Sequence, residues 1–336
     1  MLTPRADSFD AIMRKAKYKN GDQYLTTERY GKVVKGLGGL YEVRIKDGGE
    51  ISRIVCRAKG SLHRDEEKVL IGDNVTVSVD ETTPDGVVIS KIAERKNSLI
   101  RPPVANLDYL FIVFAAKKPS PVIETVDKLI SIAEHNRITP VAVITKSDLG
   151  SDIASEYLEI YKLAGIDAFI TSSSDGYGIK ELKAYISDNV KGGKTAAFAG
   201  ASGVGKSTLM NALFPKLSLM TAEISQKIER GRHTTRHVEI FDIQNGADTG
   251  FLADTPGFSL IDFARFDFFS LDELEATFRE FSKYKGKCRY ADCSHVGEGS
   301  DECAIMRAVT EGKISQTRFD SYRSIYRVLK NKNYYD

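Results

Sequence analysis

Hydrophobic and polar positions alternate in the first third of the chain in a way that is typical of short strands. From about residue 30 to residue 92, runs rich in β-branched and aromatic residues are separated by glycine turns, without a long helical stretch between them. The expected strands cover residues 31–34, 40–45, 51–57, 74–79 and 86–92. Five short strands favour a small β-barrel, and the oligonucleotide-binding (OB) fold is the commonest five-stranded form.

The middle of the chain, from about residue 97 to residue 263, alternates apolar strands with helical segments. This rhythm is typical of a βαβ fold with a largely parallel sheet. The longest apolar run, residues 109–116 (YLFIVFAA), is too short to span a bilayer and indicates a buried strand. The expected strands are 109–115, 141–144, 168–171, 195–199 and 251–253, and the expected helices lie near 122–135, 153–164 and 207–214.

From about residue 264 the chain is charged, aromatic and helical, apart from a group of cysteines. Apolar residues near its end form one helical stripe, which favours packing over base stacking. Basic residues beside the stripe leave a contact with RNA open. The stripe consists of Phe319, Tyr322, Tyr326 and Leu329, and the basic residues are Arg318, Arg323, Arg327 and Lys330.

Composition indicates a soluble globular protein with room for two or three cores, because the 336 residues are 42% hydrophobic and 28% charged. The net charge is only +2, so any surface for nucleic acid must be local. Through residue 64 the chain has 14 Lys and Arg against 7 Asp and Glu. This basic end suits phosphate backbones, with a solvated barrel face as the alternative. Asp7, Asp10 and Asp22 argue against a secretion or transit signal, so a cytoplasmic location is expected.

A phosphate-binding loop is predicted at residues 200–207 (GASGVGKS), which fit the pattern G-x-x-x-x-G-K-[ST] between an expected strand and an expected helix. Backbone N–H groups and the helix N-terminus would hold the phosphates, Lys206 would neutralise their charge, and Ser207 would ligate Mg²⁺. The expected phosphate-binding residues are Gly200, Ala201, Ser202, Gly203, Val204, Gly205, Lys206, Ser207 and Thr208.

The stretch TKSD, residues 145–148, is expected to recognise the base, with a surface turn as the alternative. The Asp148 carboxylate can accept two hydrogen bonds from guanine N1–H and N2–H₂, and adenine has no such pair of donors on that edge. Lys146 and Ser147 complete this expected base-reading loop. Thr145 stands where G proteins often have Asn, so one amide contact to the base or the P-loop is expected to be lost. Ser172 and Ser173, which follow another expected strand, could form a second base-contacting loop.

Two further segments would respond to the γ-phosphate. Asp254 begins the stretch DTPG after an apolar strand. In P-loop NTPases an Asp at this position holds Mg²⁺ through the coordination shell of the metal, and the N–H of the glycine, here Gly257, can contact the γ-phosphate. The polar loop at residues 231–237 could supply a threonine ligand for Mg²⁺. We favour Thr235 for this ligand and keep Thr234 as the alternative.

The order of these motifs differs from that of an ordinary G protein, because the base-reading stretch TKSD precedes the P-loop. Base loops, P-loop, switch threonine and DTPG nevertheless follow one another in the cyclic order of a G domain that starts at a different point. A circular permutation preserves every strand neighbour and every contact of the site. The sequence therefore predicts a circularly permuted GTPase domain.

The cysteine group has the spacing Cys288-x₄-Cys293-x-His295-x₇-Cys303. Three thiolates and one imidazole make a complete tetrahedral set with no open position, which is typical of a structural zinc site. Four cysteines in 336 residues are too few for a disulfide framework. Reactive or merely buried thiols are the alternative.

With a barrel before it and a cysteine cluster after it, this order of motifs closely resembles the RsgA family (also called YjeQ or YloQ) of bacterial ribosome-assembly GTPases. The resemblance runs from about residue 30 to residue 329, and its carriers are TKSD, GASGVGKST, GRHTT, DTPGF and the Cys/His cluster. It implies a protein that binds the small (30S) ribosomal subunit and its 16S rRNA late in maturation. GTP hydrolysis to GDP and phosphate would be stimulated by the subunit, and the protein would leave after hydrolysis.

The expected fold class is multidomain: an OB-fold β-barrel, an α/β circularly permuted P-loop GTPase and a C-terminal α-helical zinc-binding domain. The expected limits are residues 1–95 for an N-terminal extension and the barrel, 96–263 for the GTPase domain and 264–336 for the C-terminal domain. The expected cofactors are GTP/GDP, Mg²⁺ and one structural Zn²⁺. We expect a monomer without a membrane partner.

Catalysis is expected to be slow without a partner. Phe258 sits where many GTPases place the glutamine that orients the attacking water, and a phenyl ring cannot hydrogen-bond to water. His233 is the nearest polar candidate, and the resemblance favours it over a solvated loop residue. The alternative function is an RNA-binding assembly factor that uses GTP only as a conformational lock. A P-loop ATPase or small-molecule kinase is disfavoured by Asp148 and the barrel.

Overall fold

The computed structural model describes residues 28–47, 50–60, 62, 68–79, 86–215, 238–245, 248–254, 263 and 265–332. The chain divides into two compact units. One comprises Met1–Leu107 with Thr235–Phe241, and the other comprises Asp108–Thr234 with Asp242–Asp336. In the described part of the chain, no helix is both long enough and apolar enough to cross a membrane.

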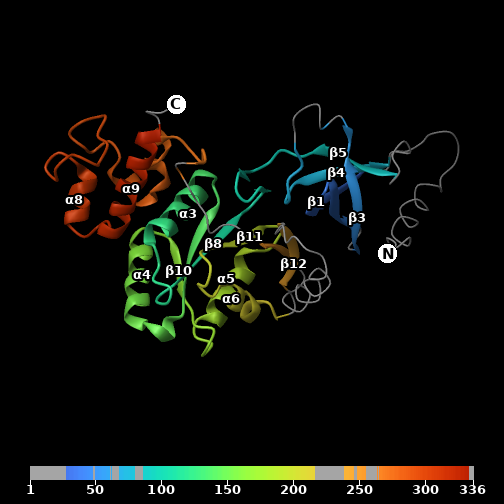
Figure 1. Cartoon of the computed structure of the whole chain (residues 1–336), viewed down its shortest axis with the longest axis horizontal. Coiled ribbons are helices and arrows are strands. Elements are labelled where there is room, and N and C mark those ends of the chain that lie inside the picture. Colours follow the sequence, from blue (N-terminus) through green and yellow to red (C-terminus); the bar gives the residue numbers. More distant parts are fainter. Residues whose placement is uncertain are drawn as a thin grey trace. The chain divides into compact units, whose positions relative to one another are not determined.

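The first unit contains the expected five-stranded β-barrel, whose strands are drawn in blue to cyan in Figure 1. Its sheet has the order β1-β2-β3-β5-β4, and β1 also pairs with β4, which closes the sheet on itself. Val33, Val43 and Ile89 point inward and are fully buried. The strands are β1 (Arg29–Leu37), β2 (Leu40–Asp47), β3 (Glu50–Ala58), β4 (Asn74–Val79) and β5 (Val87–Ile92), which confirms the barrel predicted from the alternating pattern.

A short hairpin after the barrel, β6 (Ser98–Leu99) and β7 (Val104–Ala105), is hydrogen-bonded to the barrel. The side chain of the buried Asn106 donates to the Gly72 carbonyl at 3.0 Å. A Cβ atom at Gly72 would lie 2.1 Å from the Ala105 carbonyl oxygen, so only glycine permits this approach. The hairpin belongs to the barrel unit in the structure, whereas the domain limits expected from the sequence stay a prediction.

The second unit is built on a parallel sheet with the order β10-β9-β8-β11-β13, and β12 (Glu239–Asn245) is the neighbour of β13. The chain builds the sheet outward from β8 through β9 to β10, and then returns to the other side of β8 with β11. Ligands bind at such a switch point, beyond the carboxyl ends of the strands. The strands are β8 (Tyr109–Ala115), β9 (Thr139–Thr145), β10 (Asp167–Ile170), β11 (Thr195–Ala199) and β13 (Asp248–Asp254).

Helices connect these strands, as the sequence predicted. Each begins and ends within two residues of its expected bounds wherever bounds were given. The apolar core between helices and sheet includes Phe111, Val143, Leu182, Phe198 and Leu209, which are all buried. The helices are α3 (Ile123–His135), α4 (Ser151–Leu163), α5 (Ile179–Asn189) and α6 (Lys206–Leu213).

The C-terminal segment belongs to this same unit and packs its last helix against α3, as Figure 1 shows. Phe319, Tyr322 and Leu329 are buried, which confirms the packing role of the predicted stripe. Tyr322 meets the rings of Phe278 and Phe281 edge to face. The elements are η2 (Leu271–Glu273), η3 (Glu275–Thr277), η4 (Arg279–Tyr284), α8 (Ala304–Thr310) and α9 (Gln316–Lys332).

Arg318 differs from the expectation that it adds charge to the basic side of this stripe. Its side chain is fully buried and contacts Asp127 of α3 at 2.7 Å and Glu280 of η4 at 2.9 Å. Two carboxylates therefore hold the guanidinium inside the protein, where it cannot meet RNA. The prediction was wrong for this residue because hydrophobicity alone does not reveal a buried charge with partners on other elements.

Candidate functional site

The P-loop lies between β11 and α6, at the carboxyl end of the sheet and beside the switch point. Gly200 has φ +149°, and a Cβ atom there would lie 2.1 Å from the carbonyl oxygen of Val113 in β8. The loop can therefore cross the end of β8 only with glycine at this position. The Lys206 ammonium donates to the Gly200 carbonyl at 2.9 Å, so its charge lies within the loop where phosphates are expected.

The stretch TKSD lies directly against this loop. The hydroxyl of Thr145, at the end of β9, donates to the Val204 carbonyl at 2.5 Å and also lies 3.2 Å from the Phe114 carbonyl. The Lys146 ammonium donates to the Gly203 carbonyl at 2.7 Å. Two segments that are distant in the sequence thus form one site. The contact to the P-loop that was expected to be lost with Thr145 is made by its hydroxyl instead.

Lys146 adopts a left-handed backbone conformation with φ +56°, which is uncommon for a residue with a side chain. Its ammonium also donates to the Lys118 carbonyl at 2.6 Å, in the loop that follows β8. These two carbonyl partners hold the lysine across the site, with its aliphatic stem near Gly205. The methylene groups of such a side chain can pack against the plane of a base.

The second expected base loop lies beside the first. The Ser172 hydroxyl donates to Asp148 at 2.8 Å, and the backbone N–H of Ser147 donates to the Thr171 carbonyl at 3.3 Å. Ser174 is the residue that the sequence reasoning missed, and its hydroxyl shares a 2.8 Å hydrogen bond with that of Ser172. The repeated serines of TSSSD were the available signal. One oxygen of the Asp148 carboxylate is thereby oriented before any base binds.

The γ-phosphate side of the site is described only in part. Asp254 ends β13, which runs parallel to β11, and its side chain is exposed. The remaining expected residues of this side lie outside the described residues: His233, Thr234, Thr235 and Gly257. Their roles stay predictions.

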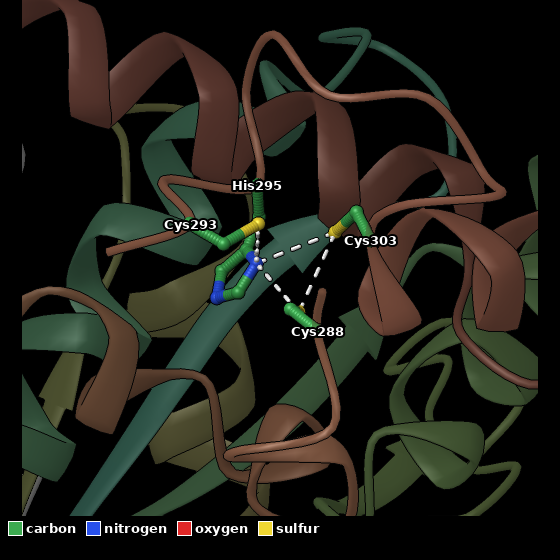
Figure 2. A group of neighbouring side chains, drawn as sticks. All are labelled: Cys288, Cys293, His295 and Cys303. Atoms are coloured by element: carbon green, nitrogen blue, oxygen red, sulfur yellow. Dashed lines mark hydrogen bonds between the residues drawn. The ribbon is translucent and has the colours of Figure 1, made fainter. Parts of the chain in front are cut away.

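The four zinc-ligand candidates converge in the C-terminal segment, as Figure 2 shows. The Nδ1 atom of His295 lies 3.6 Å from the Cys288 sulfur and 3.3 Å from the sulfurs of Cys293 and Cys303. Around a zinc ion with bonds of about 2.3 Å to sulfur and 2.0–2.1 Å to nitrogen, tetrahedral ligand atoms lie about 3.5–3.8 Å apart. The donor set and its spacing therefore fit a zinc ion with four protein ligands.

Main-chain donors support two of these sulfurs. The N–H of Ala304 donates to Cys288, and the N–H of Met306 donates to Cys303, which caps α8. Burial raises the pKa of the Cys293 and Cys303 thiols, and a bound cation would favour their thiolate forms. Cys56 is buried in the barrel strand β3, apart from this cluster in the sequence.

Comparison with known proteins identifies the family. The sequence model of the RsgA GTPase domain matches residues 92–264, and that of the RsgA N-terminal domain matches residues 30–88. The chain belongs to the RsgA GTPase family. As a member of this family it is a GTP-hydrolysing enzyme, which confirms the activity predicted from the motifs.

Relatives match this chain over almost their whole length. The small ribosomal subunit biogenesis GTPase RsgA of Agathobacter rectalis is 38% identical over 314 residues, which cover 91% of this chain and 99% of the relative. The protein of the same name from Bacillus subtilis is 36% identical over 307 residues, covering 90% and 98%.

Solved structures of RsgA-family proteins share the fold. YjeQ from Thermotoga maritima superposes with a TM-score of 0.71 at 34% identity, covering 90% of this chain and 99% of that one. YloQ, described as a circularly permuted GTPase, superposes with a TM-score of 0.72 at 31% identity, covering 93% and 99%. These likenesses confirm the permuted GTPase fold predicted from the order of the motifs.

Proposed function

We propose that this chain binds the small ribosomal subunit and its 16S rRNA, assists late maturation of that subunit, and leaves after hydrolysing GTP to GDP and phosphate. The nucleotide part of the proposal rests on the two hydrogen bonds from the side chains of Thr145 and Lys146 to carbonyls of the P-loop. These bonds join the expected base-recognition loop to the expected phosphate-binding loop. The names of the relatives support the ribosomal part.

In this proposal each segment of the site has one task. Asp148 accepts the two donors of guanine, and the P-loop amides with Lys206 bind the phosphates. Ser207 and Thr235 would hold Mg²⁺, which when bound neutralises charge on the phosphate oxygens. Gly257 would sense the γ-phosphate, and His233 would orient the attacking water.

A structural zinc ion is the second cofactor that we propose. Cys288, Cys293, His295 and Cys303 would hold it with no position open to water, so it would stabilise the segment and take no part in hydrolysis. Zinc binding would contribute free energy to the folding of this segment, because the four ligands form a site only when the segment is folded.

The barrel is proposed to contact rRNA. Lys46, Arg53 and Arg57 are exposed on β2 and β3, within the basic part of the chain. Cationic side chains on a barrel surface attract phosphate backbones with an affinity that falls as the salt concentration rises. We further propose that the protein acts as a monomer in the cytoplasm, where ribosomal subunits mature.

Steady-state GTP turnover with and without purified small subunits tests the enzymatic proposal. We expect slow turnover alone and strong stimulation by the subunit. Absence of stimulation would favour an RNA-binding factor that uses GTP as a conformational lock. Competition of GTP against ATP for binding provides the nucleotide control, and equal competition by ATP would contradict the role of Asp148.

A pull-down of small subunits with a non-hydrolysable GTP analogue or with GDP tests the binding cycle. The analogue should retain the protein on the subunit, and GDP should release it. Equal retention in both states would contradict departure after hydrolysis.

A further inference from the structure

His295 presents its two ring nitrogens to different surroundings. Nδ1 faces the three sulfurs, as Figure 2 shows, and Nε2 lies on the opposite side of the ring. There it lies 3.6 Å from a carboxylate oxygen of Glu275. When Nδ1 binds a metal, Nε2 carries the proton of the neutral imidazole, and this N–H is a hydrogen-bond donor that points at the carboxylate.

The ring is held between aromatic side chains. Phe281 lies edge to face with it at a centroid distance of 6.1 Å, and Tyr322 lies at 6.3 Å. His295 is buried and has φ +62°. A residue other than glycine keeps this left-handed backbone conformation where the surrounding structure holds it in place. Burial and the two aromatic neighbours restrict the orientation of the ring, and the Glu275 carboxylate lies where it can accept the Nε2 proton.

Glu275 comes from a segment that contains none of the four ligands. It begins η3, which packs against α3, whereas the ligands lie between Cys288 and Cys303. The Glu275 carboxylate therefore reaches His295 from outside the segment that holds the ligands.

We propose that Glu275 is the positioning residue of the zinc centre, which accepts the Nε2–H of His295 and so fixes the tautomer and the ring orientation that direct Nδ1 to the metal. Carboxylate partners of this kind raise the basicity of a histidine ligand, and their loss typically weakens metal binding about 10–100-fold. A hydrogen bond requires the two atoms to approach by about half an ångström. The Glu275 side chain, which is 37% exposed, has room for this movement.

The inference rests on the zinc occupancy proposed above, and a chelator competition on the full-length zinc-loaded protein tests it. Glu275→Ala should raise the zinc dissociation constant about 10–100-fold. Glu275→Gln keeps an acceptor oxygen without the charge and should give a smaller increase.

Glu302→Ala is the matched control. Glu302 precedes the ligand Cys303, and its side chain is 35% exposed, close to the value for Glu275. Its carboxylate bonds to Arg289 and Tyr290 and to none of the four ligands. Removal of this charge should leave zinc affinity at the wild-type value, so the comparison separates a specific contact from a general effect of charge.

Two spectroscopic measurements distinguish positioning from ligation. The absorption spectrum of the Co²⁺-substituted protein should keep its tetrahedral bands in Glu275→Ala, because no ligand is removed. The Nε2 proton of His295 should exchange slowly with water in the zinc-loaded wild type and rapidly in Glu275→Ala, as measured by NMR.

Wild-type zinc affinity in Glu275→Ala, or an equal loss in Glu302→Ala, would overturn the role of Glu275 while leaving the zinc site in place. A wild-type protein that binds no zinc would overturn the site itself, and the inference with it.

Discussion

At the residue scale, the nucleotide site depends on side chains that bond to main-chain carbonyls. Thr145 is buried, and its single hydroxyl proton goes to Val204 or to Phe114. An asparagine amide would offer two donors at this position, so the threonine retains the link to the P-loop with half the donor capacity. The bond connects base recognition to phosphate binding because Val204 lies inside the cradle.

Replacement of Thr145 by Val tests this link. The change preserves shape and leaves a buried carbonyl without its donor, so the free energy of unfolding should fall by about 1–3 kcal/mol. GTP binding should weaken in the same variant, as measured by calorimetry. Thr139→Val, at the exposed start of the same strand, is the control and should leave both quantities unchanged.

Asp148→Asn addresses the choice of base. The variant replaces one acceptor by a donor that faces guanine N1–H or N2–H₂, and each lost hydrogen bond to a charged group is worth about 1.5–3 kcal/mol. Preference should shift toward xanthosine nucleotides, whose C2 carries oxygen. Binding titrations with GTP and xanthosine triphosphate measure this shift, and unchanged selectivity for GTP would remove Asp148 from the base site.

At the element scale, α9 packs on α3 through an apolar stripe and a buried charge cluster. Burial acts against the charge of Arg318, but Asp127 and Glu280 outweigh it and raise the pKa of the guanidinium. The Phe278 ring lies 4.5 Å from the guanidinium carbon, and the Tyr161 hydroxyl donates to Asp127 at 3.3 Å. The contact between the helices therefore has polar partners that specify its register.

Arg318→Met should lower the free energy of unfolding by about 3–5 kcal/mol, because it leaves two buried carboxylates without a cation. Addition of Asp127→Asn and Glu280→Gln should recover much of this loss, since neutral groups are less costly to bury. Urea unfolding measures both effects. Arg327→Met, at an exposed position of the same helix, serves as the control, and a similar loss there would contradict a specific role for the buried arginine.

At the scale of the whole molecule, the P-loop, the TKSD stretch and the zinc candidates belong to one compact unit but to different apolar clusters. The core around the parallel sheet includes Phe111, Phe198 and Leu209, whereas the metal candidates lie beside Phe281 and Tyr322. Local loss of one cluster should therefore leave the other largely formed.

Cys293→Ser should release zinc and loosen the C-terminal segment while the P-loop still binds nucleotide. Metal analysis measures the zinc content, and hydrogen exchange of α8 and α9 measures the loosening. Full zinc content in the variant would contradict the assignment of this ligand, and loss of nucleotide binding would contradict the separation of the clusters.

The segment that begins with DTPG connects the two sites along the chain. Asp254 ends β13, and the buried Phe263 then packs against Phe268 and Phe269 and accepts a hydrogen bond from Lys332 of α9. A rearrangement after loss of the γ-phosphate would reach the C-terminal segment through this covalent path.

His233→Ala tests the use of hydrolysis for departure. The variant should bind GTP normally and stay bound to the subunit. Its rate of GTP hydrolysis should be lower than that of the wild type by about 10²-fold or more, even with subunits present. Single-turnover hydrolysis and release rates from the subunit are the measurements. Release at the wild-type rate with GTP present would contradict both the catalytic role of His233 and the proposed departure.

The sequence by itself determined most of the strands and helices, the permuted order of the motifs and the candidate zinc ligands. Period-two and helical patterns, the G-x-x-x-x-G-K-S spacing and the Cys₃His set are local, since each depends on residue types at short separations. The barrel strands and the parallel strands accordingly lie where the patterns predicted them.

Only the tertiary structure decided which groups meet across long separations. Arg318 shares a helical face with Tyr322, Ile325 and Leu329, yet its charge indicated a surface position, because its partners on α3 and η4 are not visible in the sequence of α9. The same reason applies to Thr145, whose acceptor is a main-chain carbonyl, and to Glu275, which η3 brings to His295. Main-chain carbonyls carry no sequence signature, and the burial of a charge depends on partners that only folding supplies.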